Sequence, residues 1–293
     1  MTLLQKTAQK VRSRFHPLHR LRRNWFYQRI IQPVFDIPIQ ANLGFRHPVY
    51  LRLLTHFSFL FLSRKMEERL LETLAVIVRN LRASQHSFLD VGANIGLYTW
   101  HALDVKPELH VASFEPDPRN SALLEKTSRK WSAPNLHLYP EAASNNRGQA
   151  TFSRDLLSSA TGSLDQSEPS FSEQHYGQRK SLIEVPTTTL DEAAANLPPP
   201  ALVKIDVEGH ERAVLEGARG ILEKHQPVLL IESFGEKAQG IRQILEPLGY
   251  QFQDADRAKP ATPETMNYLC LAPAETDARV LEGLAGQGFP FNS

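Results

Sequence analysis

The chain has 293 residues, 41% of them hydrophobic, which suits one α/β domain of ordinary size with an extension and argues against wholesale disorder. A formal net charge of +1 favours no class of partner, and the single cysteine, Cys270, excludes an internal disulfide. The most apolar run, residues 57–62, is far shorter than the roughly 20 residues that cross a bilayer, and no signal-peptide-like run follows the basic start. We therefore expect a cytoplasmic protein that is soluble or peripheral to a membrane.

Positive charge is concentrated at the start of the chain. Residues 1–30 carry eight Lys or Arg and no Asp or Glu, so the remainder carries about −7. Phe15, Trp25, Phe26 and Tyr27 are interleaved with these basic residues. A solvated basic arm or helix explains the pattern. Two alternatives stay open: an amphipathic anchor on an anionic membrane or glycan surface, and an organelle transit peptide.

From residue 66 onward, the spacing of apolar residues alternates between helix and strand patterns. Helices are predicted at 66–81, 95–105, 118–130, 214–222 and 241–248, and strands at 88–91, 110–114, 136–139, 202–207, 227–232, 250–252 and 268–271. Asp117 is the expected N-cap of the third helix, with Pro118 as its first residue. Strands separated by helices predict a mostly parallel sheet that is covered on both faces.

Two segments fall outside this alternation. Residues 155–181 are rich in Ser, Gln and Gly and have little apolar periodicity, which predicts a long surface loop or lid. The end of the chain, residues 283–293, is predicted to be a tail.

A glycine-containing turn at residues 90–96, with the sequence DVGANIG, joins the first predicted strand to the next helix. Gly92 and Gly96 allow a tight turn and a close approach of ligand to backbone, and ligands of open α/β sheets bind at such strand ends. A dinucleotide fingerprint would have glycine in place of Asn94 and a third glycine three residues later. The turn, including Asp90, therefore favours a nucleoside cofactor without pyrophosphate, whose amino-acid end the Asn94 amide could bind.

An acidic residue after the second strand supports the same cofactor. Glu115 follows Gly96 by 19 residues, where a carboxylate can accept hydrogen bonds from both ribose hydroxyls. The alternative is a surface acid before a helix. Glu141 and Ala142 follow the third strand, where small residues allow an adenine ring to approach; a plain turn explains them equally well.

A second polar cluster lies in VKIDVEGHE at residues 203–211. Lys204, Asp206 and Glu208 alternate along an apolar strand and so can share one face, and His210 follows them. Buried charges are costly unless paired, so the cluster predicts either a reaction site, which Glu232 could join, or a structural ion-pair network. In the second case Lys204 simply neutralises Asp206, and His210 is a surface residue at a helix start.

The two motifs together resemble the FkbM-type methyltransferases. The resemblance covers roughly residues 67–272 and rests on the turn at 90–96, Phe114-Glu115-Pro116 and the run from Lys204 to Glu211, with support from residues 189–191 and 231–232. It implies a Rossmann-like class I methyltransferase fold with a mostly parallel seven-stranded sheet, and S-adenosylmethionine as cofactor. It also implies O-methylation of a hydroxyl on a sugar, glycan or secondary metabolite. We divide the chain into a basic, helical extension at 1–65, a catalytic domain at 66–275 and a tail at 276–293.

Methyl transfer to a hydroxyl benefits from a base, and we expect Asp206 or Glu208 in that role, with His210 as the next candidate. A divalent metal held by the same acids is an alternative, although no ligand motif calls for one. Competing functions are a nicotinamide-dependent oxidoreductase, which would need a pyrophosphate-compatible turn, and a non-enzymatic binder that uses the basic arm. No nucleic-acid partner is expected, and the sequence fixes neither the acceptor nor the oligomeric state.

Overall fold

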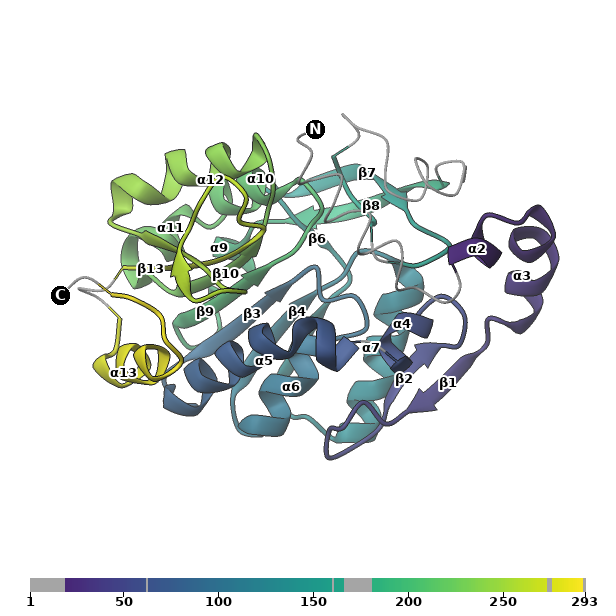
Figure 1. Cartoon of the computed structure of the whole chain (residues 1–293), viewed down its shortest axis with the longest axis horizontal. Coiled ribbons are helices and arrows are strands. Elements are labelled where there is room, and N and C mark those ends of the chain that lie inside the picture. Colours follow the sequence, from purple (N-terminus) through teal and green to yellow (C-terminus); the bar gives the residue numbers. More distant parts are fainter. Residues whose placement is uncertain (1–18, 62, 160, 166–180, 273–275, 292–293) are drawn as a thin grey trace.

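The computed structural model describes residues 19–61, 63–159, 161–165, 181–272 and 276–291. Its centre is an eight-stranded sheet with the strand order β12-β11-β13-β10-β9-β3-β4-β5 (Figure 1). The strands from β5 to β10 run parallel, while β13, β11 and β12 pair antiparallel at one end. The predicted Rossmann-like fold with a mostly parallel sheet is thus confirmed, and the eighth strand, β12, is an edge strand of two residues.

Most predicted elements form close to their expected bounds. The sheet strands are β3 (Ser87–Val91), β4 (His110–Phe114), β5 (Leu136–Tyr139), β9 (Pro200–Ile205), β10 (Val228–Glu232), β11 (Gln251–Asp254), β12 (Lys259–Pro260) and β13 (Asn267–Leu271). The helices are α5 (Ser63–Asn80), α6 (Leu97–Val105), α7 (Pro118–Trp131), α9 (Leu190–Ala193), α10 (Glu211–Glu216), α11 (Arg219–His225), α12 (Lys237–Leu245) and the 3₁₀ turn η2 (Glu246–Leu248). Asp117 caps α7 by accepting a hydrogen bond from the backbone N–H of Arg119, as predicted.

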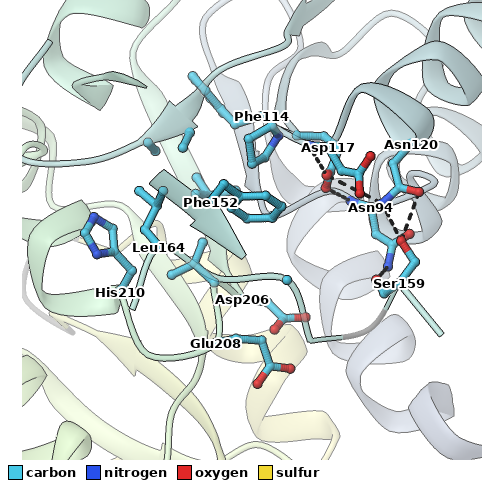
Figure 2. Close-up of a pocket in the computed structure, with 18 of the residues that line it drawn as sticks. Asn94, Phe114, Asp117, Asn120, Phe152, Ser159, Leu164, Asp206, Glu208 and His210 are labelled. Atoms are coloured by element: carbon cyan, nitrogen blue, oxygen red, sulfur yellow. Dashed lines mark hydrogen bonds between the residues drawn. The ribbon is translucent and has the colours of Figure 1, made fainter. Parts of the chain in front are cut away.

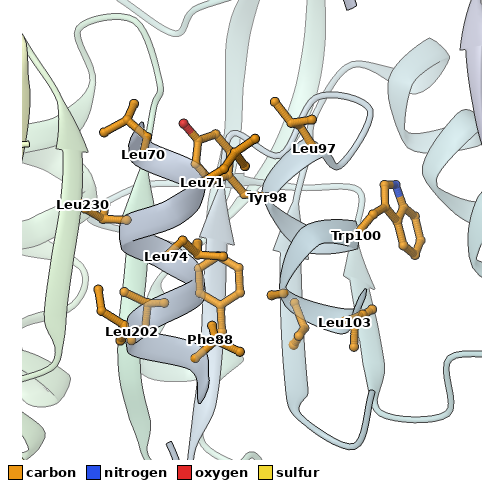
Figure 3. Close-up of a cluster of buried hydrophobic side chains, with 14 of the residues drawn as sticks. Leu70, Leu71, Leu74, Phe88, Leu97, Tyr98, Trp100, Leu103, Leu202 and Leu230 are labelled. Atoms are coloured by element: carbon orange, nitrogen blue, oxygen red, sulfur yellow. The ribbon is translucent and has the colours of Figure 1, made fainter. Parts of the chain in front are cut away.

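Each face of the sheet has its own apolar core, because successive strand residues point to opposite faces. Phe88 and Leu202 point toward α5, where Leu74 lies, and the fully buried Trp100 of α6 belongs to the same core (Figure 3). The alternate strand residues, such as Leu89, belong to the core under α10, α11 and α12. The helices are thereby held on both faces, and the carboxyl ends of the parallel strands are left free to build a site.

Two segments differ from the expectations. The extension is not only helical: after α2 (His19–Arg22), the π-helical η1 (Tyr27–Ile31) and α3 (Gln32–Phe35), it forms the hairpin β1 (Pro38–Ala41) and β2 (Val49–Arg52), then α4 (Phe57–Phe61). Its expected boundary at residue 65 falls inside α5. The predicted tail at 276–293 contains α13 (Ala278–Gly286), because the apolar side chains Val280 and Leu284 are buried in the core beside α5.

A small second sheet was not predicted. It has the order β6-β8-β7, with β6 (Ala142–Ala143), β7 (Gly148–Arg154) and β8 (Ser181–Thr188). Strands β7 and β8 pair antiparallel, so the loop expected at 155–181 connects the two strands of a hairpin. Among the described residues, no helix is long and apolar enough to span a membrane.

Candidate active site

The turn after β3 leaves no room for a side chain. Gly92 has φ 77°, and a Cβ atom there would lie 1.9 Å from the backbone oxygen of Asp206. The backbone N–H of Gly92 donates to the Phe114 carbonyl at 3.0 Å, and that of Asp206 donates to the Val91 carbonyl at 3.0 Å. Glycine is required here because the turn is pressed between the ends of two neighbouring strands.

A hydrogen bond joins Asn94 of this turn to Glu115, which follows β4. The Asn94 backbone N–H donates to one Glu115 oxygen at 2.8 Å, and the Asp117 N–H donates to the other at 2.8 Å. Burial raises the pKa of Glu115 to about 7, against the opposing effect of these hydrogen bonds. In the described part of the chain, the buried Oδ1 atom of Asn94 has no hydrogen-bond partner, so it is available to a donor from a ligand.

A pocket opens over these residues at the carboxyl ends of β3, β4 and β9 (Figure 2). Its lining is partly polar and partly apolar. The polar residues include Asn94, Glu115, Asp117, Asn120 and Ser159. The apolar residues include Phe114, Ala142, Phe152, Leu164 and Val207. A ligand with an apolar ring system and several hydroxyls fits such a division.

The segment expected to be a surface loop forms one wall of the pocket. We call residues 155–159 and 161–165 the covering segment. Asn120 donates to Ser159 Oγ at 2.7 Å, and the Asn94 side chain donates to the Ser159 carbonyl at 2.7 Å. Further along, Ser163 Oγ donates to the Glu208 carbonyl at 2.8 Å, and Asp165 pairs with Lys237 at 2.8 Å. The covering segment is therefore held by side-chain hydrogen bonds and an ion pair.

Lys204 lies beneath the pocket and supports the carboxylate above it. Its ammonium is buried, donates to Asp206 Oδ2 at 3.0 Å and lies 4.6 Å from the centre of the Tyr98 ring. Burial would lower the pKa of Lys204, but the charges of Asp206 and Asp90 raise it above its usual value. The side chain of Asp206 keeps 31% of its surface exposed and faces the pocket.

Glu208 and His210 follow Asp206 along the pocket. Glu208 has φ 52°, a left-handed conformation that is uncommon for a residue with a side chain. His210 exchanges a hydrogen bond with Ser144 Oγ at 2.9 Å, and burial lowers the pKa of its ring. Figure 2 shows Asp206 and Glu208 together on one side of the pocket, with His210 apart from them beside Leu164. Within the described ranges, no three His, Cys, Asp or Glu side chains gather in a way that could hold a metal ion.

A family model described as the methyltransferase FkbM domain matches residues 90–252, more than half of the chain. The chain belongs to the FkbM methyltransferase family. Its cofactor is S-adenosylmethionine, and membership favours methyl transfer over the nicotinamide-dependent and non-enzymatic alternatives. The match begins at Asp90 and therefore includes the turn, Glu115 and the run from Lys204 to Glu211.

Several solved structures resemble this FkbM chain. An FkbM methyltransferase from Methylobacillus flagellatus is 19% identical, with a TM-score of 0.44, over 66% of this chain and 45% of its own. Fibrillarin from Aeropyrum pernix, whose structure holds S-adenosylmethionine, is 14% identical, with a TM-score of 0.41, over 81% of this chain and 86% of its own. A precorrin-6y methyltransferase from Geobacter metallireducens is 14% identical, with a TM-score of 0.39, over 69% of this chain and 86% of its own.

The chain spans less than half the length of the Methylobacillus protein that it matches. No curated protein matches it.

The predicted site residues divide into two groups. Those that line the pocket are Gly92, Asn94, Glu115, Ala142, Asp206, Glu208 and His210. The others do not line it: Asp90, Gly96 and Lys204 are packed beneath, and Glu141 lies outside the lining. Asp90 accepts hydrogen bonds from the backbone and hydroxyl of Thr99 at 3.0 and 2.6 Å. Its role in the fold is to tie β3 to α6.

Several lining residues were not predicted from the sequence. They are Asp117, Asn120, Phe152, Asp155, Ser159 and Leu164. The first two lie at the start of the helix after Glu115, so position alone could have indicated them. The others come from β7 and the covering segment, and no local pattern indicates that this hairpin folds back over the sheet.

Proposed function

We propose that the chain is an O-methyltransferase acting on a hydroxyl of a sugar, glycan or secondary metabolite. The observation that carries the proposal is the pair of carboxylates, Asp206 and Glu208, which lie together in the pocket that Glu115 also lines. When bound, the cofactor supplies an electrophilic methyl group on a positively charged sulfur. A hydroxyl needs a base to become an effective nucleophile, and two carboxylates at the pocket offer one.

The pocket residues suit the parts of this cofactor. Glu115 accepts the ribose hydroxyls, for which each of its oxygens keeps acceptor capacity beyond the backbone N–H that it already binds. Asn94, with its unpartnered Oδ1, accepts a hydrogen bond from the ammonium of the amino-acid end. Phe114 and Ala142 form the apolar surface for the adenine ring. Gly92 gives the backbone access that a side chain would block.

Asp206 is the proposed base. The Lys204 ammonium holds Oδ2, which orients the carboxylate and leaves Oδ1 to take the proton of the acceptor hydroxyl. The deprotonated acceptor oxygen would then be the nucleophile toward the methyl group that the bound cofactor would supply. Glu208 is the alternative base. His210 is less suited, because its ring is hydrogen-bonded to Ser144 and lies beside Leu164, apart from the two carboxylates.

The test combines product analysis with one substitution. Glycan and metabolite pools are incubated with the protein and a deuterium-labelled donor, and tandem mass spectrometry locates the added methyl group on oxygen or nitrogen. On the acceptor found, Asp206→Asn should lower turnover by about 10²–10⁴-fold. Calorimetric affinity for S-adenosylhomocysteine should change little. Glu208→Gln tests the alternative base in the same way, and unchanged turnover in Asp206→Asn would exclude that residue as the base.

Turnover with a chelator separates this mechanism from metal-assisted activation of the hydroxyl. A carboxylate base predicts equal rates before and after the chelator is added. A loss of rate that Mg²⁺ or Mn²⁺ restores would assign the two carboxylates to a metal instead.

A further inference from the structure

The first described helices expose their apolar side chains and bury polar ones, which is the reverse of a normal surface helix. Of the nine large hydrophobic side chains that are exposed in the described residues, seven lie between positions 21 and 37. These are Leu21, Trp25, Phe26, Ile30, Val34, Phe35 and Ile37, and we call them the outward face. Figure 1 shows α2 and α3 at the edge of the molecule, away from the sheet.

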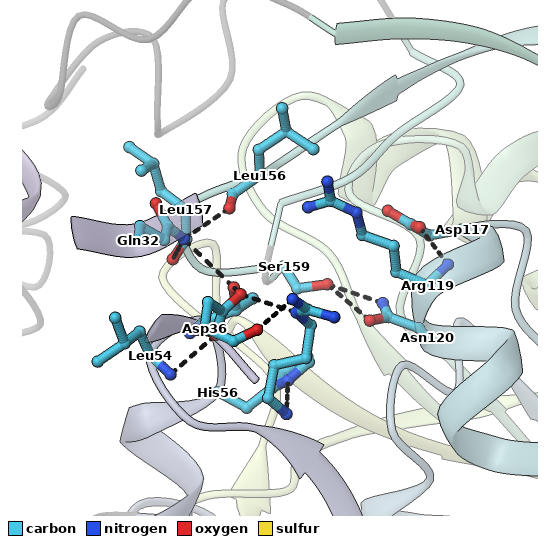
Figure 4. A network of polar contacts seen from close by, with 12 residues as sticks. Gln32, Asp36, Leu54, His56, Asp117, Arg119, Asn120, Leu156, Leu157 and Ser159 are labelled. Carbon is cyan, nitrogen blue, oxygen red and sulfur yellow. Dashed lines mark hydrogen bonds and ion pairs between the residues drawn. The ribbon is translucent and has the colours of Figure 1, made fainter. Parts of the chain in front are cut away.

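Polar side chains of the same segment point inward instead. The buried Arg22 donates to the carbonyls of Leu54 and Thr55, each at 3.0 Å. Gln32 donates to the Leu156 carbonyl at 2.8 Å (Figure 4). These bonds to the backbone fix which side of the helix faces the protein.

Asp36 completes this inward set. It accepts hydrogen bonds from the backbone N–H groups of Leu54 and Thr55, each at 2.9 Å, and it pairs with Arg52 at 2.8 Å (Figure 4). Burial tends to raise the pKa of Asp36, and its hydrogen bonds to Thr55 and Arg52 more than offset this, so that the pKa is lowered. With its only acid buried and its apolar residues outward, the segment is built to meet something apolar.

The charge around the outward face indicates the chemistry of what it meets. Arg23 and Arg29 are exposed among the apolar residues, and residues 19–35 contain no acid. The preceding part of the sequence adds four more basic residues and no acid over positions 1–18, which lie outside the described residues. Trp, Phe and aliphatic side chains beside Arg are typical of helices that lie in the interface of an anionic bilayer. The spacing supports one continuous surface, since 26, 30 and 34 recur once per turn.

We propose that the outward face docks the protein onto an anionic lipid bilayer, with Trp25, Phe26, Ile30 and Val34 inserted at the level of the headgroups. Arg23 and Arg29 then meet lipid phosphates and carboxylates. The helix stays attached to the protein through Arg22 and Gln32, which remain hydrogen-bonded on the opposite side. Because Gln32 also binds the covering segment at Leu156, the docked helix is joined directly to one wall of the pocket.

The first experiment measures sedimentation of the full-length protein with vesicles of phosphatidylcholine, with and without phosphatidylserine. The wild type should bind strongly only when phosphatidylserine is present. The variant Phe26→Ser/Ile30→Ser/Val34→Ser should bind at least about 100-fold more weakly, because burying one such side chain changes a partition constant roughly tenfold or more. Leu182→Ser, which changes an exposed residue on β8, is the matched control and should bind normally.

Charge is tested separately from apolar contact. Arg29→Gln should weaken binding to phosphatidylserine vesicles by about fivefold, as expected for one basic residue near an anionic surface. Lys130→Gln, an exposed change at the end of α7, should have no such effect. Equal losses in the two variants would mean that net charge, not this face, controls binding, and would overturn the proposal.

Trp25 gives an independent readout. Its side chain is 68% exposed, whereas Trp100 is fully buried. Vesicles that bind the outward face should shift the fluorescence emission to shorter wavelength, and Trp25→Phe should remove the shift while binding persists. Absence of any vesicle binding would overturn the proposal. So would sedimentation velocity showing a wild-type dimer that the triple variant converts to a monomer, because the face would then join two copies of the chain.

Discussion

The two sides of the pocket are built by different means. The turn at 92–96 and Glu115 are fixed by strand ends that lie side by side in one sheet, and a Cβ atom at Gly92 would overlap the backbone of the next strand. The covering segment belongs to another hairpin and is attached through Ser159, Ser163 and Asp165. Where backbone packs closely against backbone, an added atom has no space, so a substitution there should be costly. A single side-chain hydrogen bond contributes only about 1 kcal/mol to stability.

This difference implies that changes on the sheet side should cost stability as well as binding. Changes in the covering segment should affect binding of the cofactor and leave the fold intact. Four experiments test this contrast.

The largest effect is expected at Lys204. Lys204→Met should lower the free energy of unfolding by about 3–5 kcal/mol, because it leaves the fully buried Asp90 without an opposing cation. Chemical denaturation measures the loss. Lys126→Met, at an exposed position, should cost far less. Adding Asp90→Asn to Lys204→Met should recover part of the stability, and a double variant as unstable as the single one would contradict this account.

Gly92→Ala should lower the free energy of unfolding by about 3 kcal/mol, because of the strained φ and the overlap with the Asp206 backbone. Gly249→Ala is the matched control, since Gly249 also has positive φ (83°) but a Cβ atom added there would meet no other atom within 4 Å. It should cost only about 1–2 kcal/mol. Melting temperatures and calorimetric affinities for S-adenosylhomocysteine compare the two variants. Equal losses of stability would show that close packing is unimportant at Gly92.

Binding of S-adenosylhomocysteine should depend on pH through Glu115. Since burial raises the pKa of this carboxyl to about 7, it is mostly protonated at about pH 6 and mostly ionised at about pH 8. The ionised form is the better acceptor for ribose hydroxyls, so affinity should rise with pH by up to about tenfold per unit below the pKa. Glu115→Gln should flatten the profile, and Glu141→Gln should not. A flat wild-type profile would remove Glu115 from the ribose site.

The smallest effect is expected in the covering segment. Ser159→Ala removes the hydrogen bonds between this hydroxyl and Asn120 and should weaken S-adenosylhomocysteine binding about three- to tenfold, with little change in melting temperature. Thr151→Val removes a hydroxyl bonded to Glu184 elsewhere in the hairpin and should leave affinity unchanged. A large loss of stability in Ser159→Ala would mean that the covering segment is part of the folding core.

Much of the α/β domain could be predicted because its signals are local. The β3 turn, the cap at Asp117 and the strand bearing Lys204 and Asp206 each depend on residues close together in the chain. The parallel topology then follows from the alternation of strands and helices, and it brings Glu115 and Asp206 to the same edge of the sheet. Asp90 was expected to bind the cofactor and Lys204 to belong to the reaction cluster, but both are packed beneath the pocket, because their side chains point toward α6.

The covering segment and α13 show where local signals fail. The polar residues of the covering segment form hydrogen bonds to pocket residues more than 35 positions earlier and later in the chain. In the sequence, such a segment looks the same as a solvated loop. α13 is short and is stabilised by burying Val280 and Leu284 beside α5, far away in sequence.

By itself, the sequence determined the order of strands and helices, the glycine-containing turn at 90–96, the acid at 115 and the concentration of positive charge at the start of the chain. Only the tertiary structure decided which polar residues face the pocket and which are packed beneath it. It also decided that the hairpin β7–β8 supplies a wall of the site, and that the first helices turn their apolar side outward. The physical reason is that turns and periodic patterns depend on neighbours in the chain, whereas burial and hydrogen bonding depend on neighbours in space.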